Sequence, residues 1–148
     1  MSRERVALLA VRIALGVFFI FEGWDKLPWM LDSGLLTVAL KKWADTGVPV
    51  SKWYIETILI PGVPVFARLV FLGEVATGLA LLSGVWLRSA AIIAFLMVLN
   101  IHFAHSSIFQ YGFLSKGDGL PILGGLLALA IAGGGSSSNR PSGPRKRK

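Results

Sequence analysis

Four stretches of apolar residues run along the chain, separated by segments rich in polar and aromatic side chains. The stretches cover residues 6–21, 63–83, 89–104 and 120–132. The hydrocarbon layer of a membrane offers no water to hydrogen-bond a backbone, so segments of this kind cross it as helices. Extended over their flanks, the predicted helices cover about residues 5–27, 63–84, 88–106 and 117–135. The pattern therefore predicts an all-α integral membrane four-helix bundle.

The fourth stretch is the shortest and contains Pro121. A membrane span needs about 20 residues, and extending this stretch back through Asp118 and forward through residues 133–135 supplies them. Small residues recur at every fourth position in the second and fourth helices, a spacing that favours close helix contact in lipid. They are Ala76, Ala80 and Gly84 in the second helix and Gly124, Ala128 and Ala132 in the fourth.

The longest connection covers residues 28–62 and joins the first two predicted helices. It contains Trp29, Trp43, Trp53 and Tyr54. Aromatic side chains of this kind favour the headgroup level, so the segment is expected to lie on the membrane surface as a long extracytoplasmic loop. Residues 35–43 within it form either a short interfacial helix or an ordered loop that caps the bundle, and the sequence leaves both open.

Composition agrees with a membrane protein of one domain. Hydrophobic residues make up 54% of the 148 residues, and the mean hydropathy is +0.67. Residues 1–135 are predicted to form one transmembrane domain, and residues 136–148 a disordered basic tail rich in Gly, Ser and Pro. There are no cysteines, which excludes disulfides and iron–sulfur clusters bound by the chain's own cysteines.

The net charge of +7 is concentrated at the C-terminal end. Nucleic-acid binding needs a basic face on a folded surface, so no nucleic-acid partner is predicted, and the tail is expected to contact anionic lipid. Cationic residues gather in the segments on the side of the termini, whereas acidic residues offset the lysines of the opposite side. The positive-inside rule then predicts a multi-pass protein of the cytoplasmic membrane with both termini in the cytoplasm.

Ionisable side chains inside membrane helices are costly and indicate function. Depth along each predicted helix, at about 1.5 Å per residue, decides which of them can meet. This reasoning predicts a cluster in the outer half of the bundle with two polar residues beneath it. The outer members are Glu22, Arg68, His102, His105 and Asp118, and the deeper ones are Glu74 and Asn100.

Each member of this cluster has a functional and a structural interpretation. Glu74 is the candidate catalytic residue, because a carboxylate at that depth needs a cation, a proton or a ligand. Glu22 pairs either with Arg68, as a structural bridge between two helices, or with Lys26, four residues along its own helix. His102 and His105 share one helix face and suit a quinone carbonyl or the membrane interface. No metal site is predicted, and haem is excluded because both histidines lie on one helix.

Two groups of residues resemble the DoxX family. The first is Arg12-Ile-Ala-Leu-Gly16 followed by Phe18-Phe19, Glu22-Gly23 and Lys26-Leu27, and the second is Gly73-Glu74 followed by the segments 78–84 and 88–91. The resemblance implies a small four-helix membrane protein of bacteria or archaea. Some members are similar to the small subunit of a thiosulfate:quinone oxidoreductase, and others are linked to membrane-associated oxidative-stress complexes. The positions that match the family pattern are Arg12, Gly16, Gly23, Lys26, Glu74 and Gly84.

The sequence thus favours a quinone-interacting or accessory subunit of a membrane redox complex. Any enzymatic activity would belong to a quinone-linked oxidoreductase of which this chain is one part. In this hypothesis a quinone lies near Glu74, His102 and His105, while Arg68 orients the carboxylates. The alternatives are an assembly subunit without chemistry of its own and a transporter of protons or small solutes.

Overall fold

The computed structural model describes residues 2–115 and 117–133, and over these residues it contains helices and turns but no strand. The predicted disordered tail, residues 136–148, lies outside the described residues. In chain order the helices are α1 (Arg3–Asp25), α2 (Leu27–Leu31), α3 (Ser33–Thr46), α4 (Pro49–Tyr54), the π-helical turn η1 (Ile55–Leu59), α5 (Val63–Ser83), α6 (Leu87–Ala104), the 3-10 turn η2 (Ser107–Phe109), α7 (Gly112–Ser115) and α8 (Leu120–Ala132).

Three helices, α1, α5 and α6, are long and apolar enough to cross a membrane. The first three predicted membrane helices thus correspond to three apolar helices of membrane length. The fourth differs, because α8 begins at Leu120 and contains 13 residues, which corresponds to only about 20 Å. Asp118 therefore precedes α8 instead of opening it, and Pro121 occupies the first turn, where its missing N–H costs nothing.

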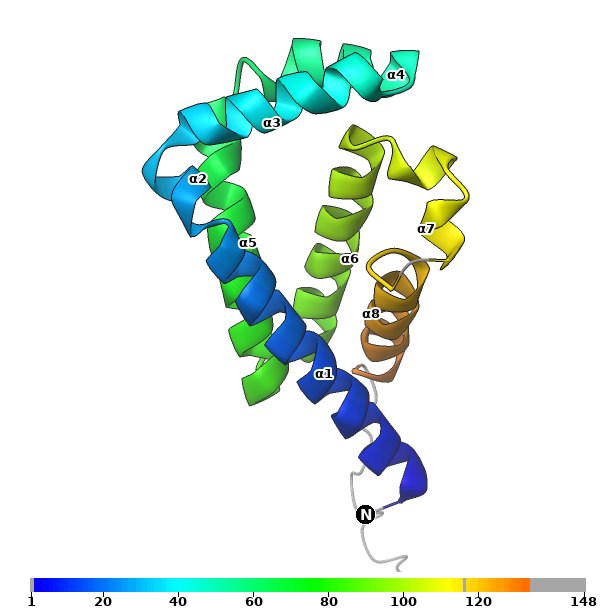
Figure 1. The fold of residues 1–148 in the computed structure, drawn as a ribbon. Coiled ribbons are helices and arrows are strands. Elements are labelled where there is room, and N and C mark those ends of the chain that lie inside the picture. The colour runs from blue at the N-terminus through cyan, green and yellow to red at the C-terminus, as the bar shows by residue number, and fades with distance from the viewer. Residues whose placement is uncertain (1, 116, 134–148) are drawn as a thin grey trace, which may run out of the picture.

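The connection between α1 and α5 is helical along most of its length, in place of the predicted loop. α3 extends well beyond the predicted residues 35–43, and the side chain of Asp32 caps it by accepting a hydrogen bond from the Gly34 N–H at 2.9 Å. Its buried residues Leu36, Leu40 and Ala44 repeat every four positions and form one apolar face. Figure 1 shows α3 and α4 running across one end of the molecule.

Two serines fix α4 to the end of α6. The buried Ser51 hydroxyl donates to the Phe103 carbonyl at 2.7 Å, and the Val48 N–H donates to the Ser106 hydroxyl at 3.1 Å. Ser106 adopts a left-handed backbone with φ of 62°, which turns the chain sharply after α6. The helices across this end are thereby joined to the membrane-length helices by hydrogen bonds as well as by apolar packing.

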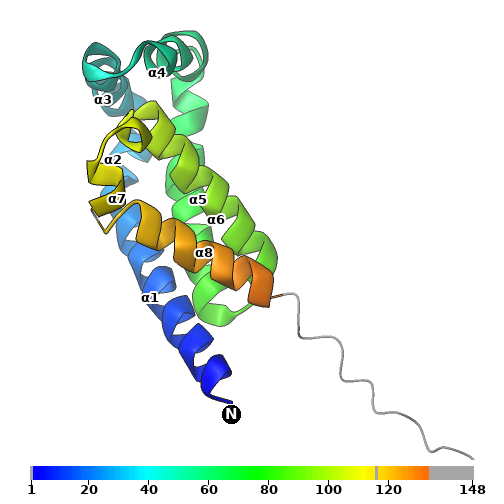
Figure 2. The same cartoon turned by 90° about the vertical axis from the view of Figure 1, so that its right-hand side faces the viewer.

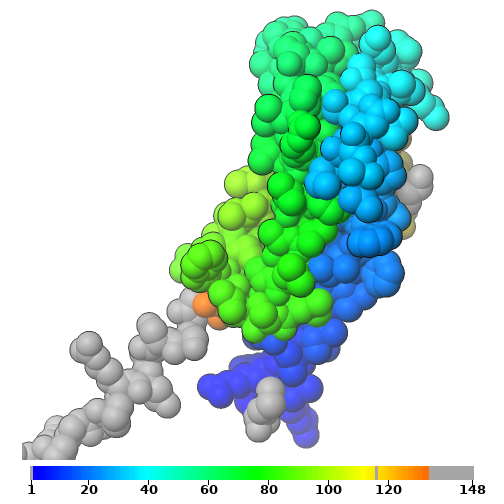
Figure 3. Space-filling model, turned by 90° about the vertical axis from the view of Figure 1, so that its left-hand side faces the viewer, coloured from blue at the N-terminus to red at the C-terminus, as the bar shows by residue number. Residues whose placement is uncertain are grey.

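Glycines set the contact between α1 and α5, which lie side by side in Figure 3. A Cβ on Gly78 would lie 2.9 Å from the Gly16 carbonyl oxygen, and a Cβ on Gly23 would lie 2.7 Å from Val75 Cγ2. The backbones can approach this closely because neither glycine carries a side chain. Of the predicted seam residues of this helix, Ala80 packs against the core and Gly84 lies against Arg12, whereas Ala76 is exposed. Gly78, which was not predicted, makes the close contact with Gly16.

α8 packs against α6 and α1, as Figure 2 shows for α6. Leu126 and Leu129 are buried in a shared core with Phe19 and Leu81. The predicted seam through Gly124 is wrong, because a Cβ there would meet nothing within 4 Å. Its neighbour Gly125 faces α1 instead, one position further round the helix.

Candidate functional site

Lys26 ends α1 and connects the polar residues of two helices. Its Nζ lies 2.8 Å from Oε2 of Glu22, one turn back, and 3.2 Å from the Glu22 carbonyl oxygen. The same Nζ lies 3.7 Å from Oε2 of Glu74 on α5. Glu22, Lys26 and Glu74 are called the lysine–glutamate cluster below. It contains two carboxyl groups and one ammonium group, so a further proton or positive group would neutralise it.

Glu74 is the most buried ionisable residue of the cluster, with 4% of its surface exposed. Its Oε2 has no hydrogen-bond partner among the described residues. Gly23 allows this position, because a Cβ there would lie 3.3 Å from the Glu74 Cβ. A buried oxygen without a hydrogen bond is costly. The geometry therefore favours a proton or a hydrogen-bond donor from a ligand at this oxygen.

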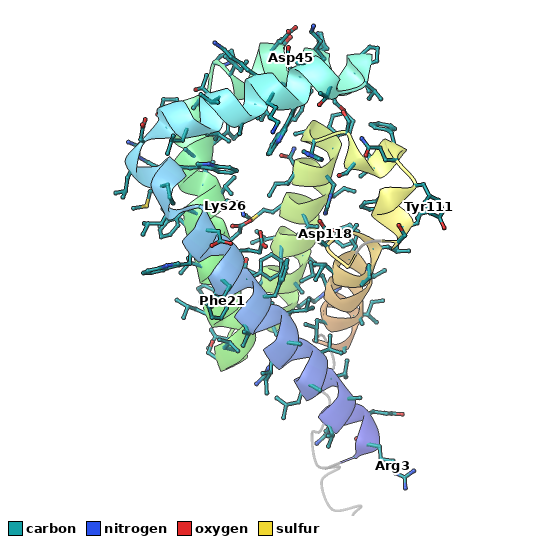
Figure 4. The ribbon with its side chains drawn as sticks, in the orientation of Figure 1. Arg3, Phe21, Lys26, Asp45, Tyr111 and Asp118 are labelled. Carbon is teal, nitrogen blue, oxygen red and sulfur yellow. The ribbon has the colours of Figure 1, made fainter. Side chains whose placement is uncertain are left out.

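A cavity of about 150 Å³ opens beside Glu74. Its polar lining comes from four elements of the chain, and this space is called the polar cavity. It is lined by Glu22, Glu74, His102 and Asp118 together with Phe18, Phe19, Val98 and Ile101. In Figure 4 Lys26 and Asp118 lie at about the same level of the molecule, on opposite sides of this region.

His102 separates the polar cavity from a second space of about 230 Å³, called the histidine cavity, and both His102 and Asp118 line both cavities. His102 Nε2 lies 2.9 Å from the Asp118 carbonyl oxygen, and Nδ1 lies 2.7 Å from the Ser107 hydroxyl. A carbonyl oxygen only accepts, so Nε2 carries the proton and donates it. The imidazole thus holds Asp118, two residues before α8, beside α6.

On the other side of the cluster lies a third space of about 130 Å³ beneath α3, called the tryptophan cavity. Lys26 and Asn100 are the polar residues of a lining that is otherwise apolar. Trp29 and Trp43 pack edge to face with ring centroids 6.5 Å apart, and Lys26 Nζ lies 5.7 Å from the Trp29 centroid. Asn100 also lines this cavity, and its amide donates to the Tyr54 hydroxyl at 2.6 Å.

The structure brings four of the seven predicted site residues together at the polar cavity, and His105 lines the neighbouring histidine cavity with His102 and Asp118. Glu22, Glu74, His102 and Asp118 line the polar cavity. Asn100 lies on the far side, in the tryptophan cavity, and His105 packs its exposed ring edge to face against Trp43 at 5.2 Å. The predicted Glu22–Arg68 ion pair is wrong. Arg68 is exposed and donates to the Pro64 carbonyl on its own helix.

Lys26 is the site residue that depth alone did not select. Two sequence signals pointed to it, namely its position four residues after Glu22 and its match to the family pattern. The positions that match this pattern also contact one another in the structure. Gly16 and Gly23 pack on α5, Lys26 pairs with Glu74, and the Arg12 guanidinium packs against Gly84.

Comparison with known proteins assigns the chain to a family. The DoxX family pattern matches residues 7–106, and the chain therefore belongs to the DoxX family. It is also similar to the Inner membrane protein YqjF of Escherichia coli (strain K12), with 32% identity over 137 residues, covering 91% of this chain and 90% of that protein. No solved structure matches the chain. With its three membrane-length helices, the protein is a membrane protein.

Proposed function

We propose that this protein is a quinone-binding accessory subunit of a redox complex in the cytoplasmic membrane, with both termini in the cytoplasm. The observation that carries the proposal is the position of Lys26. Lys26 lines the tryptophan cavity, with its Nζ 5.7 Å from the Trp29 ring centroid. The same Nζ pairs with Oε2 of Glu74, a buried residue that lines the polar cavity. A hydrogen-bond donor facing an apolar space is thus linked directly to a buried proton-exchanging group.

The quinone ring fits the tryptophan cavity by chemistry and by size. Quinone carbonyls accept hydrogen bonds. Of the three N–H donors of Lys26, two are used on Glu22, which leaves one for a quinone carbonyl. Asn100 has a second amide hydrogen besides the one on Tyr54. Pockets for drug-sized ligands measure about 300–1,000 Å³, so a space of about 130 Å³ suits a single ring. The edges and faces of Trp29 and Trp43 supply apolar contact for that ring.

The polar side of the cluster suits proton exchange. Reduction of a quinone to a quinol takes up two electrons and two protons, and in this proposal the electrons come from a partner redox subunit. Glu74 exchanges the protons through the Lys26 contact. The polar cavity and the histidine cavity connect Glu74 to His102 and Asp118, which gives protons a route towards the surface. In this proposal His102 and His105 therefore belong to the proton route and do not contact the quinone ring. Lys26 orients the carboxylates, which is the role that the sequence analysis gave to Arg68.

The test is purification of the full chain in a gentle detergent, with extraction and chromatographic measurement of quinone. Lys26→Met and Glu74→Gln are both expected to lose the bound quinone. Lys26→Met removes the hydrogen-bond donor, and Glu74→Gln removes the charge that holds the Lys26 ammonium group in position. Glu56→Gln is the matched control. Glu56 is an exposed glutamate that pairs with Lys52 at 3.8 Å and lines none of the three cavities. Quinone absent from the unaltered protein, or retained by both cluster variants, would contradict the proposal.

The assembly-subunit alternative is favoured by a separate observation. Gly16, Gly23 and Gly78 let α1 and α5 pack at backbone contact, and Glu22 neutralises Lys26 without any ligand. This alternative expects partner proteins without quinone in the same purification. It also expects loss of the whole complex when the α1–α5 contact is disturbed. Proton flux into liposomes containing this chain alone would favour the transporter alternative.

A further inference from the structure

We infer that the groove between α5 and α6 holds the isoprenoid tail of the quinone, so that the substrates are long-tailed membrane quinones and not short water-soluble ones. This inference rests on the proposed function. It is carried by a different part of the molecule, one that contains no member of the lysine–glutamate cluster.

The groove is larger than any of the three cavities described above, at about 420 Å³. Leu69 on α5 and Leu96 on α6 line it, and both are more than half exposed. Both helices are of membrane length, so the groove opens towards lipid. Figure 3 looks onto α5, with α1 on one side and α6 on the other. A hydrocarbon chain is the occupant that this apolar, lipid-facing space suits.

Continuity with the tryptophan cavity distinguishes this groove from an ordinary lipid-facing surface. Phe66, Val70, Asn100 and Ile101 line both spaces. A ring at Lys26 would therefore place its tail directly between α5 and α6, with the far end of the tail in the bilayer. The alternative exit is poor for a hydrocarbon chain, because the space on the other side of Lys26 is lined by Glu22, Glu74 and Asp118.

The floor of the groove can adapt to a chain. A Cβ on Gly73 would lie 2.6 Å from Cε and 2.8 Å from Sδ of Met97, so the methionine fills the space in front of the glycine. Methionine is unbranched and changes rotamer easily, and it can move aside for a methyl-branched tail. The α1–α5 contact differs, because there the backbone itself closes the space at Gly16 and Gly78.

The experiment is photolabelling of the full chain in liposomes, with a benzoquinone whose tail ends in a diazirine. The labelled peptides are mapped by mass spectrometry, and a fatty alcohol with the same diazirine but no ring serves as the comparison probe. An excess of unlabelled decyl-benzoquinone competes for the ring site. We expect the quinone probe to label α5 and α6 at the groove, and decyl-benzoquinone to reduce this labelling. Labelling by the fatty alcohol should not change when decyl-benzoquinone is added.

Leu96→Trp fills the groove and is expected to reduce groove labelling to the level of the fatty alcohol. Leu99→Trp is the matched control, because Leu99 is an exposed leucine on the same helix that does not line the groove. The tail site would be wrong, although quinone binding would stand, if decyl-benzoquinone reduced labelling only at other positions. Equal groove labelling of the two variants would also contradict the tail site. If no labelling anywhere is competed by decyl-benzoquinone, the proposed function itself fails.

Discussion

Lys26 Nζ and Glu74 Oε2 lie 3.7 Å apart, and theirs is the only ion pair in the described part of the chain that connects two membrane-length helices. The pair is largely shielded, with 16% of the lysine side chain and 6% of the glutamate side chain exposed. Removing one partner of a shielded pair leaves an uncompensated charge, whereas removing both charges does not.

Lys26→Met is therefore expected to lower the stability of the protein in detergent by about 2–3 kcal/mol. The double variant Lys26→Met/Glu74→Gln should recover much of that loss, because no buried charge remains. Thermal unfolding in detergent measures the stability of the single and the double variant. The control is Lys52→Met, which disturbs the exposed pair with Glu56 and should cost less than about 1 kcal/mol. Equal losses for Lys26→Met and Lys52→Met would count against this account.

Gly78→Ala tests the glycine contact between α1 and α5. The new methyl group would meet the Gly16 carbonyl oxygen at 2.9 Å and Ile20 at 2.8 Å, so the helices must separate, at a cost of about 1–3 kcal/mol. Gly124→Ala is the matched control because it has open space, and its better helix propensity should leave stability unchanged or raised by up to about 1 kcal/mol. The expectation fails if both variants unfold at the same temperature.

Gly84→Ala tests the end of α5. Gly84 has φ of 78°, a left-handed conformation that costs an alanine about 1–2 kcal/mol, and its Cβ would also meet Arg12 Nη1 at 2.7 Å. The double variant Arg12→Ala/Gly84→Ala should relieve the clash but not the backbone cost. Unfolding temperatures of the two variants separate these effects. A Gly84→Ala variant as stable as the unaltered protein would contradict both the clash with Arg12 and the cost of the left-handed backbone.

Ser51→Ala tests the attachment of α4 to α6. It removes the buried hydrogen bond to the Phe103 carbonyl, which is worth about 1 kcal/mol, and we expect faster amide hydrogen exchange over α4. Ser115→Ala is the control, since its hydroxyl is bonded only within α7 at 3.5 Å. If α4 exchanges at the same rate in both variants, other contacts hold this end in place.

The membrane-length helices were predictable because a long run of apolar residues indicates that a segment lies in the hydrocarbon layer and not in water. The ends of α1 and α5 follow from the same pattern, and Gly84 marks the end of α5 through its left-handed backbone. The helices of the 27–59 segment were less predictable. Trp29 and Trp43 suggested an interfacial loop, whereas the four-residue repeat of Leu36, Leu40 and Ala44 forms the buried face of α3.

Depth along a predicted helix does not determine which face of the helix a residue occupies. Arg68 and Glu74 are six positions apart on α5, which turns their side chains about 120° from one another at 3.6 residues per turn. They therefore face different sides of α5, and they also lie about 9 Å apart along its axis. Lys26 approaches Glu74 because Gly23, one turn earlier, lets α1 lie close to α5. That distance depends on tertiary packing, which a single sequence does not specify.

The shortness of α8 has a consequence for the surrounding bilayer. At about 20 Å, α8 is shorter than a hydrocarbon layer of about 30 Å, whereas α5, with 21 residues, matches that layer more closely. Where α8 crosses the bilayer, the lipid beside it must thin locally, and each ångström of thinning costs a fraction of a kcal/mol. A protein that deforms its bilayer on one side only would gather where the membrane is already thin. Acyl-chain length would then help to decide which neighbours it meets.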